Sequence, residues 1–180
     1  LMKDPIKRPI FNINQHAQKC SQNIMNELNI LVEHLLEEQS INRFPELNKL
    51  ITKTCLNDVF IPHLNKTYKV IEDELCSQEN YIWTDDIKFN EALVDSNSSN
   101  VDVMRILAEN YFKATIYILQ DTIPKKIMYY LVTQSQKDIG SKLYEIIKKS
   151  ELNDLLKEVD NIQERSCLLY TSDAADEVRS

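Results

Sequence analysis

Apolar or small residues recur every three or four positions from Val103 to Ile118 and again, beyond Pro124, from Met128 to Ile146, and this spacing restricts the possible folds more than any other feature. Such a spacing places side chains on one face of an α-helix. The face consists of Val103, Leu107, Tyr111, Ala114, Ile118, Met128, Leu131, Ser135, Ile139, Leu143 and Ile146. It predicts one long amphipathic helix, or two collinear ones, over residues 101–147. Pro124 lacks a backbone N–H and crowds the carbonyl of Gln120, so a kink is expected nearby.

A second stripe widens the apolar face in the first half of this segment. Its members are Met104, Ala108, Phe112, Ile116, Leu119 and Ile123. A helix needs so wide an apolar arc when it contacts two neighbours instead of one. The segment is therefore expected to lie inside a helical bundle.

The chain contains a single glycine, Gly140, among 180 residues that are 43% hydrophobic. Folds rich in strands and tight turns use far more glycine, so the predicted class is all-α. The phosphate-binding loops of nucleotide enzymes need several glycines to bring backbone N–H groups against phosphate. We therefore predict no nucleotide site and no enzymatic activity in this chain.

Two further helices are predicted before the long one. The first covers about residues 14–38, with the apolar stripe Ala17, Cys20, Ile24, Leu28, Leu31 and Leu35. The second covers about residues 45–78, with an interruption at Pro62. The short connection around residues 39–44 requires the second helix to return antiparallel to the first, and Pro45 suits a first helical turn. A short amphipathic helix is expected over residues 151–163.

Charge and composition exclude several kinds of partner. The net charge of −7 and the dispersed basic residues argue against nucleic-acid binding. No apolar run approaches the roughly 20 residues of a membrane span, and no secretory signal is visible, so a cytosolic location is expected. Cys20, Cys55 and Cys76 have no paired spacing, and we expect small buried hydrophobes instead of disulfides or a metal site.

Both ends of the sequence look unnatural. Leu1 is not an initiator, and the proline-broken opening segment suggests that upstream sequence is missing. Residues 167–176 resemble the conceptual translation of a sequencing-library adapter. Residues 167–180 are accordingly treated as a non-native tail.

The chain resembles the C-terminal part of the stalk and the GTPase effector domain of the dynamin superfamily, especially fission-type dynamin-related proteins. The resemblance covers most of residues 17–165. In the first half the matching features are Cys20, Arg43-Phe44-Pro45-Glu46-Leu47, Glu72-Asp73-Glu74-Leu75 and Tyr81-Ile82. The more specific second half matches at Tyr111-Phe112, Asp121-Thr122-Ile123-Pro124-Lys125-Lys126-Ile127-Met128, Leu131-Val132, Lys137-Asp138, Leu143-Tyr144, Leu152-Asn153-Asp154-Leu155-Leu156 and Gln163-Glu164-Arg165.

This resemblance implies a domain organisation. Residues 1–79 would be the C-terminal part of the stalk, residues 80–100 a linker in place of a lipid-binding insert, and residues 101–166 the effector domain. The implied fold is an elongated antiparallel helical bundle with a short C-terminal helix. Because the family's stalk has four helices and this chain supplies three, an apolar stripe should remain uncovered.

The resemblance also implies a function. Such a segment forms homo-oligomers through its stalk helices and stimulates GTP hydrolysis in a head, absent here, that binds GTP and magnesium. The intact protein would act in the cytoplasm at organelle membranes, in membrane fission such as mitochondrial or peroxisomal division, with microtubule binding a further family role. It would contact the membrane by assembly or through an adaptor. Two alternatives stay open, namely a stand-alone helical scaffold or tether and an Mx-like dynamin-family protein.

No catalytic, cofactor-binding or metal-binding residue is predicted. The candidates for an assembly interface are Arg43, Phe44, Lys125, Lys126, Tyr129 and Tyr130. The competing interpretation of the two lysines is that they form a solvated surface pair. Aromatic residues are common anchors of interfaces, which favours an interface role for the two tyrosines. The competing interpretation is that at least one of the tyrosines belongs to the core.

Overall fold

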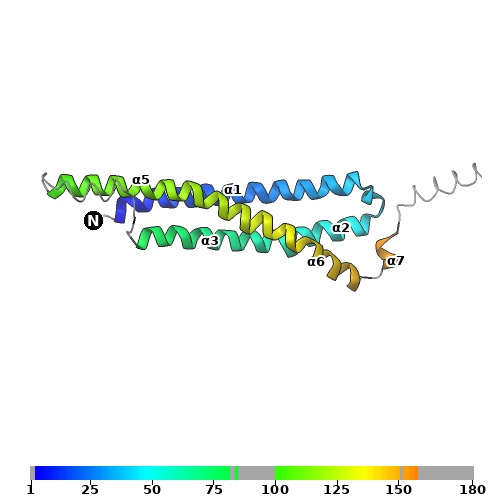
Figure 1. Ribbon diagram of the computed structural model, residues 1–180. Coiled ribbons are helices and arrows are strands. Elements are labelled where there is room, and N and C mark those ends of the chain that lie inside the picture. The colour runs from blue at the N-terminus through cyan, green and yellow to red at the C-terminus, as the bar shows by residue number, and fades with distance from the viewer. Residues whose placement is uncertain (1–2, 82–83, 85–99, 151, 158–180) are drawn as a thin grey trace, which may run out of the picture. The chain divides into compact units, whose positions relative to one another are not determined.

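The computed structural model describes residues 3–81, 84, 100–150 and 152–157. Every element in these ranges is a helix or helical turn (Figure 1), which confirms the predicted all-α class. Most of the predicted linker at residues 80–100, including Trp83 and Phe89, and the tail at residues 167–180 lie outside the described residues. None of the described helices is both long and apolar enough to cross a membrane.

Helix α1 runs from Lys3 to Glu38. Its end agrees with the sequence prediction, whereas the predicted start near residue 14 was wrong by several turns. Pro5 lies in the first turn, where a helix has no internal hydrogen bond to lose, so it is tolerated there. Pro9 removes only one internal bond, and the chain remains helical through it.

A tight reversal follows α1, as predicted. Ser40 adopts a left-handed conformation with φ of 56°, and its N–H donates to the carbonyl of Glu37 at 2.9 Å. The short 3-10 turn η1, Ile41–Arg43, comes next, and the Phe44 N–H donates to the Ile41 carbonyl at 2.9 Å. Pro45 then begins α2, because its fixed φ suits the first turn of a helix.

The second predicted helix is present and is interrupted where expected. It consists of α2, Pro45–Thr54, the π-helical turn η2, Cys55–Phe60, and α3, Ile61–Asn80. The N–H of Ile61 reaches back five residues to the carbonyl of Leu56. The wider turn just before Pro62 accommodates a residue that cannot donate a hydrogen bond.

The long third helix is also present, but its irregularity lies beyond the predicted site. Helix α5, Asn100–Ile127, passes through Pro124 and continues into the π-helical turn η3, Met128–Thr133, and then α6, Gln134–Lys149. The Gln134 N–H bonds to the Tyr129 carbonyl, again five residues back. Of the predicted helix at residues 151–163, the described part holds α7, Leu152–Leu155.

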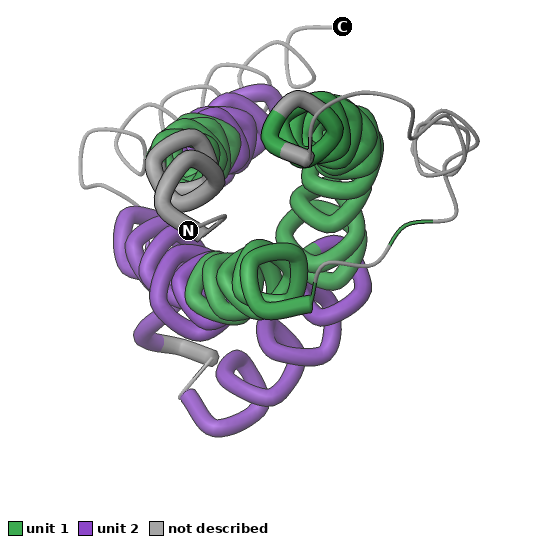
Figure 2. Tube along the Cα trace, turned by 90° about the vertical axis from the view of Figure 1, so that its left-hand side faces the viewer, with its two compact units in different colours: residues 1–25, 63–135 green, residues 26–62, 136–180 purple. Residues whose placement is uncertain are grey.

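The chain divides into two compact units, coloured separately in Figure 2. Unit 1 contains residues 1–25 and 63–135, and unit 2 contains residues 26–62 and 136–180. Within unit 1, α5 runs antiparallel to α3, because Lys66, Glu74 and the Gln78 carbonyl contact Tyr130, Lys126 and Tyr111 respectively. The Tyr68 hydroxyl donates to the Gln18 carbonyl at 3.4 Å and joins α3 to α1.

The core of unit 1 contains a buried ridge with a strict four-residue repeat. It consists of Leu107, Tyr111, Thr115, Leu119, Ile123, Ile127, Leu131 and Ser135. In an α-helix of 3.6 residues per turn, each step of four advances the ridge by about 40° around the axis. The wider π-helical turn η3 rotates the face back by part of that drift, which keeps Leu131 and Ser135 buried.

Several predicted stripe positions consequently lie outside the core. Ile118 is 43% exposed and Met104 and Met128 are each 52% exposed. On α1 the buried residues are Ala17, Ser21, Met25 and Leu36, whereas Leu31 and Leu35 are about half exposed. The apolar spacing predicted the helices, but it did not predict which apolar residues of each helix are buried.

Unit 2 has a small core of its own. Thr54, Cys55, Val59 and Phe60, around the turn from α2 into η2, are buried, and Leu155 of α7 is also buried. Helix α7 packs against α2. Burial raises the pKa of the Cys55 thiol, as expected for a cysteine that serves as a small hydrophobe. The same expectation was wrong for Cys20 and Cys76, which are exposed.

Candidate assembly surfaces

An apolar groove lies within unit 1 between α1 and α5. It encloses about 700 Å³. Its lining is almost entirely apolar and comes from Ile13, Ala17, Cys20, Ile24, Ile116, Leu119, Ile123, Pro124, Ile127 and Met128, with polar side chains from Asn12, His16 and Gln120. The His16 ring is already engaged, because its Nδ1 atom lies 2.7 Å from the Asn12 carbonyl oxygen. The groove therefore suits an apolar occupant.

Within unit 2, the second half of α1 carries apolar residues on one face. Leu28, Leu31 and Leu35 follow one another at spacings of three and four residues. Leu31 is 53% exposed and Leu35 is 47% exposed. The uncovered apolar stripe expected from the three-helix composition stays a prediction, and these residues are candidates for it. A contiguous exposed apolar face usually marks a surface that binds a further protein segment.

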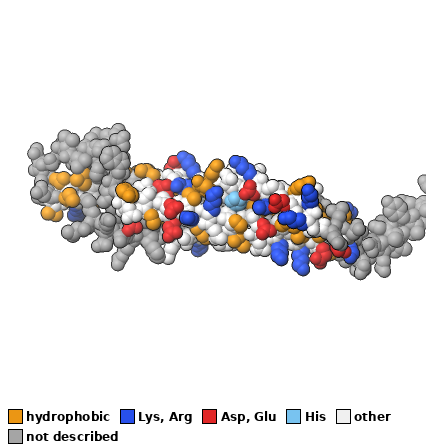
Figure 3. Space-filling model, turned by 90° about the horizontal axis from the view of Figure 1, so that it is seen from below, with side chains coloured by type: hydrophobic (Ala, Val, Ile, Leu, Met, Phe, Trp, Pro, Cys, Tyr) orange, Lys and Arg blue, Asp and Glu red, His pale blue; other side chains and the backbone are white. Residues whose placement is uncertain are grey.

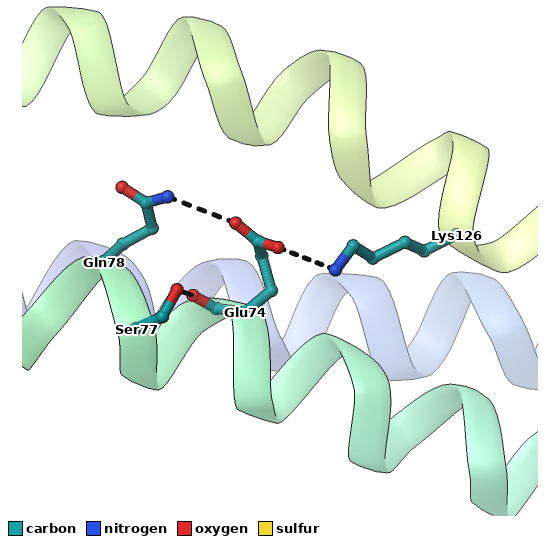
Figure 4. A network of polar contacts seen from close by, with 4 residues as sticks. All are labelled: Glu74, Ser77, Gln78 and Lys126. Carbon is teal, nitrogen blue, oxygen red and sulfur yellow. Dashed lines mark hydrogen bonds and ion pairs between the residues drawn. The ribbon is translucent and has the colours of Figure 1, made fainter. Parts of the chain in front are cut away.

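Lys126, a predicted assembly residue, is engaged within unit 1. Its Nζ atom lies 2.6 Å from Oε2 of Glu74 on α3, and both side chains are mostly buried. Figure 4 shows Glu74 between Lys126 and Gln78, whose Nε2 donates to Glu74 Oε1 at 3.1 Å. The hydrogen bond from Lys126 lowers the pKa of the Glu74 carboxyl, with a smaller contribution from Gln78, against the opposing effect of burial. Lys126 thus holds α5 against α3.

Lys125 differs from its neighbour. It pairs with Asp121 one turn earlier on α5 at 2.5 Å, and both side chains are about 70% exposed. Lys125 is therefore a solvated surface charge, as the competing interpretation expected, whereas Lys126 is not. Adjacent residues point to different faces of a helix, which is why the two lysines separate.

The tyrosine pair lies on η3 at the surface of unit 1. The two rings meet edge to face, with centroids 5.0 Å apart and an interplanar angle of 87°. Tyr129 is 50% exposed and Tyr130 is partly buried, with Lys66 Nζ 5.4 Å from its ring centroid. Neither ring belongs to the buried core, contrary to the expectation that at least one would. An accessible aromatic pair keeps the interface interpretation open.

Arg43 and Phe44 lie at the reversal between α1 and α2. The Arg43 guanidinium carbon is 4.7 Å from the centroid of the Phe44 ring, within the range of a cation–π contact. Phe44 also precedes Pro45 in a non-helical conformation and directs the chain into α2. The pair therefore has a structural role at the turn, beside any role in assembly.

The rest of the described surface carries mixed charges. On the face shown in Figure 3, basic and acidic side chains are interspersed and no single basic stripe is present. Among the described residues, no group of three or more histidine, cysteine or acidic side chains is placed to hold a metal ion. Among the described residues, the candidate assembly surfaces are therefore the apolar groove and faces of mixed charge.

Comparison with known proteins gives two family matches that together cover nearly the whole chain. Residues 3–98 match the dynamin central region and residues 96–173 match the dynamin GTPase effector domain. The chain belongs to the dynamin family. No individual curated protein matches it. The two matched regions are those that form the stalk and effector in dynamins, and the GTPase domain is not among them.

Membership of this family gives the helices a role. Central and effector regions of dynamins are segments that self-assemble, so the matched residues correspond to a stalk and effector segment. The sequence alone did not reveal that Glu74 and Lys126 form a pair. Both residues lie in stretches that resemble the family, but a partner 52 positions away leaves no local pattern.

Proposed function

We propose that this dynamin-family segment polymerises through its helices and stimulates GTP hydrolysis in a head domain of the same polypeptide. That head would bind GTP and magnesium. Assembly around a membrane would then couple hydrolysis to fission or remodelling. The segment itself contributes packing surfaces and transmits force, and it performs no chemistry.

The observation that carries this proposal is the open apolar groove between α1 and α5. Apolar area removed from water contributes about 25 cal/mol per Å², so an exposed groove of this kind favours association strongly. An amphipathic helix fits such a groove through side chains spaced three and four residues apart. We expect that helix to come from a further stalk segment, in the same polypeptide or in a second copy.

The first test places a charge in the groove. Ile116→Asp puts a carboxylate on a partly buried lining position, and we expect it to reduce both self-association and binding of a hydrophobic dye by the chain. Sedimentation velocity and dye fluorescence measure the two effects. Ile106→Asp is the matched control, because Ile106 lies on the same helix, is 47% exposed and is not part of the groove lining. A monomeric wild-type chain without dye binding would contradict the proposal.

The second test concerns the head domain. The coding sequence upstream of residue 1 should contain a G-x-x-x-x-G-K-[ST] loop in the same reading frame, since that loop is the phosphate-binding element of such GTPases. GTP hydrolysis by the whole protein should then rise with protein concentration and lose this rise in Ile116→Asp. An upstream sequence without the loop would favour a helical scaffold or tether.

The location that accompanies this function is cytoplasmic, at the surface of an organelle membrane. A fluorescent fusion of the whole protein should appear as puncta on the membrane that it divides. A uniform cytoplasmic signal under all conditions would argue against a fission role.

A further inference from the structure

Two of the long helices contain one wide turn each. The second long helix widens at η2, where the N–H of Ile61 reaches the Leu56 carbonyl, five residues back. The third widens at η3, where the N–H of Gln134 reaches the Tyr129 carbonyl over the same interval. Such a turn holds about one residue more than an α-helical turn, while the helix on both sides keeps its register. Each turn therefore contains a surplus residue, meaning one that an uninterrupted α-helix would not hold.

Ser135, two residues after η3, shows what the wide turn costs. Its hydroxyl is buried and has no hydrogen-bond partner among the described residues. The buried hydroxyls of Ser21 and Thr67, also in unit 1, each bond to the carbonyl four residues back, at 2.8 and 2.7 Å. For Ser135 that carbonyl belongs to Leu131, which lies inside η3. An unpaired buried hydroxyl destabilises the observed form of the turn, because nothing offsets its loss of water.

Other hydrogen bonds at the two turns are also weak or missing. Pro62 follows η2 by two residues and has no N–H, so it donates no backbone bond to the carbonyls of that turn. At η3 the Thr133 hydroxyl donates to the Met128 carbonyl at 3.1 Å. This bond lies at the surface, where water can replace it. Turn η2 thus lacks a backbone donor, and η3 depends in part on a bond that solvent can replace.

Both turns lie close to the division between the two compact units. Turn η2 ends at Phe60, and the second long helix passes into unit 1 after Pro62. Turn η3 ends at Thr133, and the third long helix passes into unit 2 after Ser135. Helix α1 changes units after Met25 as an uninterrupted α-helix. Wide turns are among the few features at which helices kink sharply, so the two irregular helices can bend here while each unit keeps its own core.

We propose that η2 and η3 are bending joints, at which their helices change direction by exchanging hydrogen bonds five residues apart for bonds four residues apart. The α-helical segments on both sides stay intact, and a few residues at each joint absorb the change in φ and ψ. In the rearranged η3, Ser135 bonds to the carbonyl four residues back, as Ser21 and Thr67 do. Helix α1 has no such turn and limits the movement. The inference goes beyond assembly and GTP hydrolysis and depends on neither.

Deletion of the surplus residue tests each joint in the whole chain. Removal of Tyr129 from η3, or of Asp58 from η2, leaves a sequence that fits a continuous α-helix. Each deletion should leave the circular dichroism spectrum unchanged and slow the amide hydrogen exchange of its turn by about tenfold, because the turn no longer opens locally. Removal of Asp73, an exposed residue in the regular part of α3, is the matched control.

The control deletion should lower the thermal midpoint of unfolding. It rotates one side of α3 by about 100° relative to the other, because a regular helix has no slack to absorb the change. If removal of Tyr129 lowered the midpoint as much as removal of Asp73, η3 would contain no surplus residue and the proposal would be overturned.

Distances along one helix measure bending directly. Spin labels at Lys113→Cys and Lys142→Cys, exposed positions on either side of η3, should give a broad distance distribution in a chain whose native cysteines are replaced by alanine. Deletion of Tyr129 should narrow that distribution by about half. Labels at Lys19→Cys and Glu37→Cys, exposed positions of α1, are the matched control and should give a narrow distribution. A distribution across η3 as narrow as that along α1 would overturn the joint.

Ser135→Ala separates a joint from a fixed irregularity of the helix. It removes the unpaired hydroxyl of the observed form and the bond of the rearranged form, so it should raise the urea midpoint of unfolding and narrow the distribution across η3. Ser21→Ala removes a hydroxyl that is already paired, so it should lower the midpoint and leave the distribution unchanged. A lower midpoint with an unchanged distribution in Ser135→Ala would overturn the exchange of hydrogen bonds proposed for η3.

Discussion

The groove of unit 1 and a polar cleft of unit 2, between the second half of α1 and helix α2, both use helix α1, yet they present opposite chemistry. The groove is lined by residues such as Ile24 and Ile116 and has few polar atoms, whereas the cleft is bordered by Glu33, Glu37, Lys49 and Lys53. Apolar burial provides strength that salt does not screen, while paired charges provide orientation and register. Helix α1 therefore borders two surfaces that differ in their chemistry.

The largest expected effect concerns the buried ridge that supports the groove. Leu131 is fully buried, so Leu131→Ala should lower the free energy of unfolding by about 2–5 kcal/mol through lost burial and a residual cavity. Leu35→Ala makes the same change at a residue that is 47% exposed, and should cost less than about 1 kcal/mol. Urea denaturation followed by circular dichroism measures both. Equal losses would mean that the apolar face of α1 is as well covered as the core of unit 1.

A smaller effect is expected at the ion pair between α3 and α5. Lys126→Met should cost about 1–2 kcal/mol at neutral pH, because it leaves the mostly buried Glu74 carboxylate without its cation. Lys125→Met removes an exposed pair and should cost less than about 0.5 kcal/mol. Urea denaturation of the two variants at pH 7 separates a buried charge contact from an exposed one. Equal costs would contradict the assignment of Lys126 to the packing of unit 1.

The same pair should also give a pH dependence. The pKa of Glu74 is lowered in the folded chain from its ordinary value of 4.5. The stabilisation is therefore present above that ordinary value and is lost as the pH falls through the lower folded value. Wild-type stability should drop over this acidic range by more than that of Lys126→Met. Identical pH profiles of stability for the wild type and Lys126→Met would show that the protonation of Glu74 does not affect folding.

The smallest expected effect uses the exposed cysteines as reporters. Cys20 lines the groove, and Cys76 is exposed elsewhere on unit 1. In chains that keep only Cys55 and one of these two, self-association through the groove should slow the labelling of Cys20 severalfold and leave Cys76 unaffected. Reaction with a thiol reagent at low and high protein concentration measures the difference. Equal protection at both sites would indicate that association does not use the groove.

The fold class and the helix order could be predicted from local patterns. Apolar spacing defines each long helix, and prolines such as Pro45 and Pro62 mark where a helix begins or is interrupted. These signals act within a few residues along the chain, so they can be read without a partner. The position of η3 could not be predicted in this way. It lies at Met128–Thr133, beyond Pro124, where Leu131 is buried in the ridge.

The candidate surfaces were predicted less well than the fold. The idea of an uncovered apolar stripe came from the number of helices and stays a prediction, for which the half-exposed Leu31 and Leu35 of α1 are candidates. The cleft was not predicted, because Glu33 and Lys49 belong to separate helices and look like ordinary solvated charges in the sequence. Arg43, Phe44, Tyr129 and Tyr130 remain candidates for assembly.

The sequence by itself determined that this chain is helical, that its helices are amphipathic and that it lacks the glycines of a phosphate-binding loop. Each of these depends on residue type and short spacing, which act locally. Only the tertiary structure decided that Leu119 is buried while Ile118 is exposed. Only the tertiary structure likewise decided that Lys126 of α5 forms an ion pair with Glu74 of α3. Burial and charge pairing depend on which neighbour fills the space beside a residue, and that neighbour comes from a distant part of the chain.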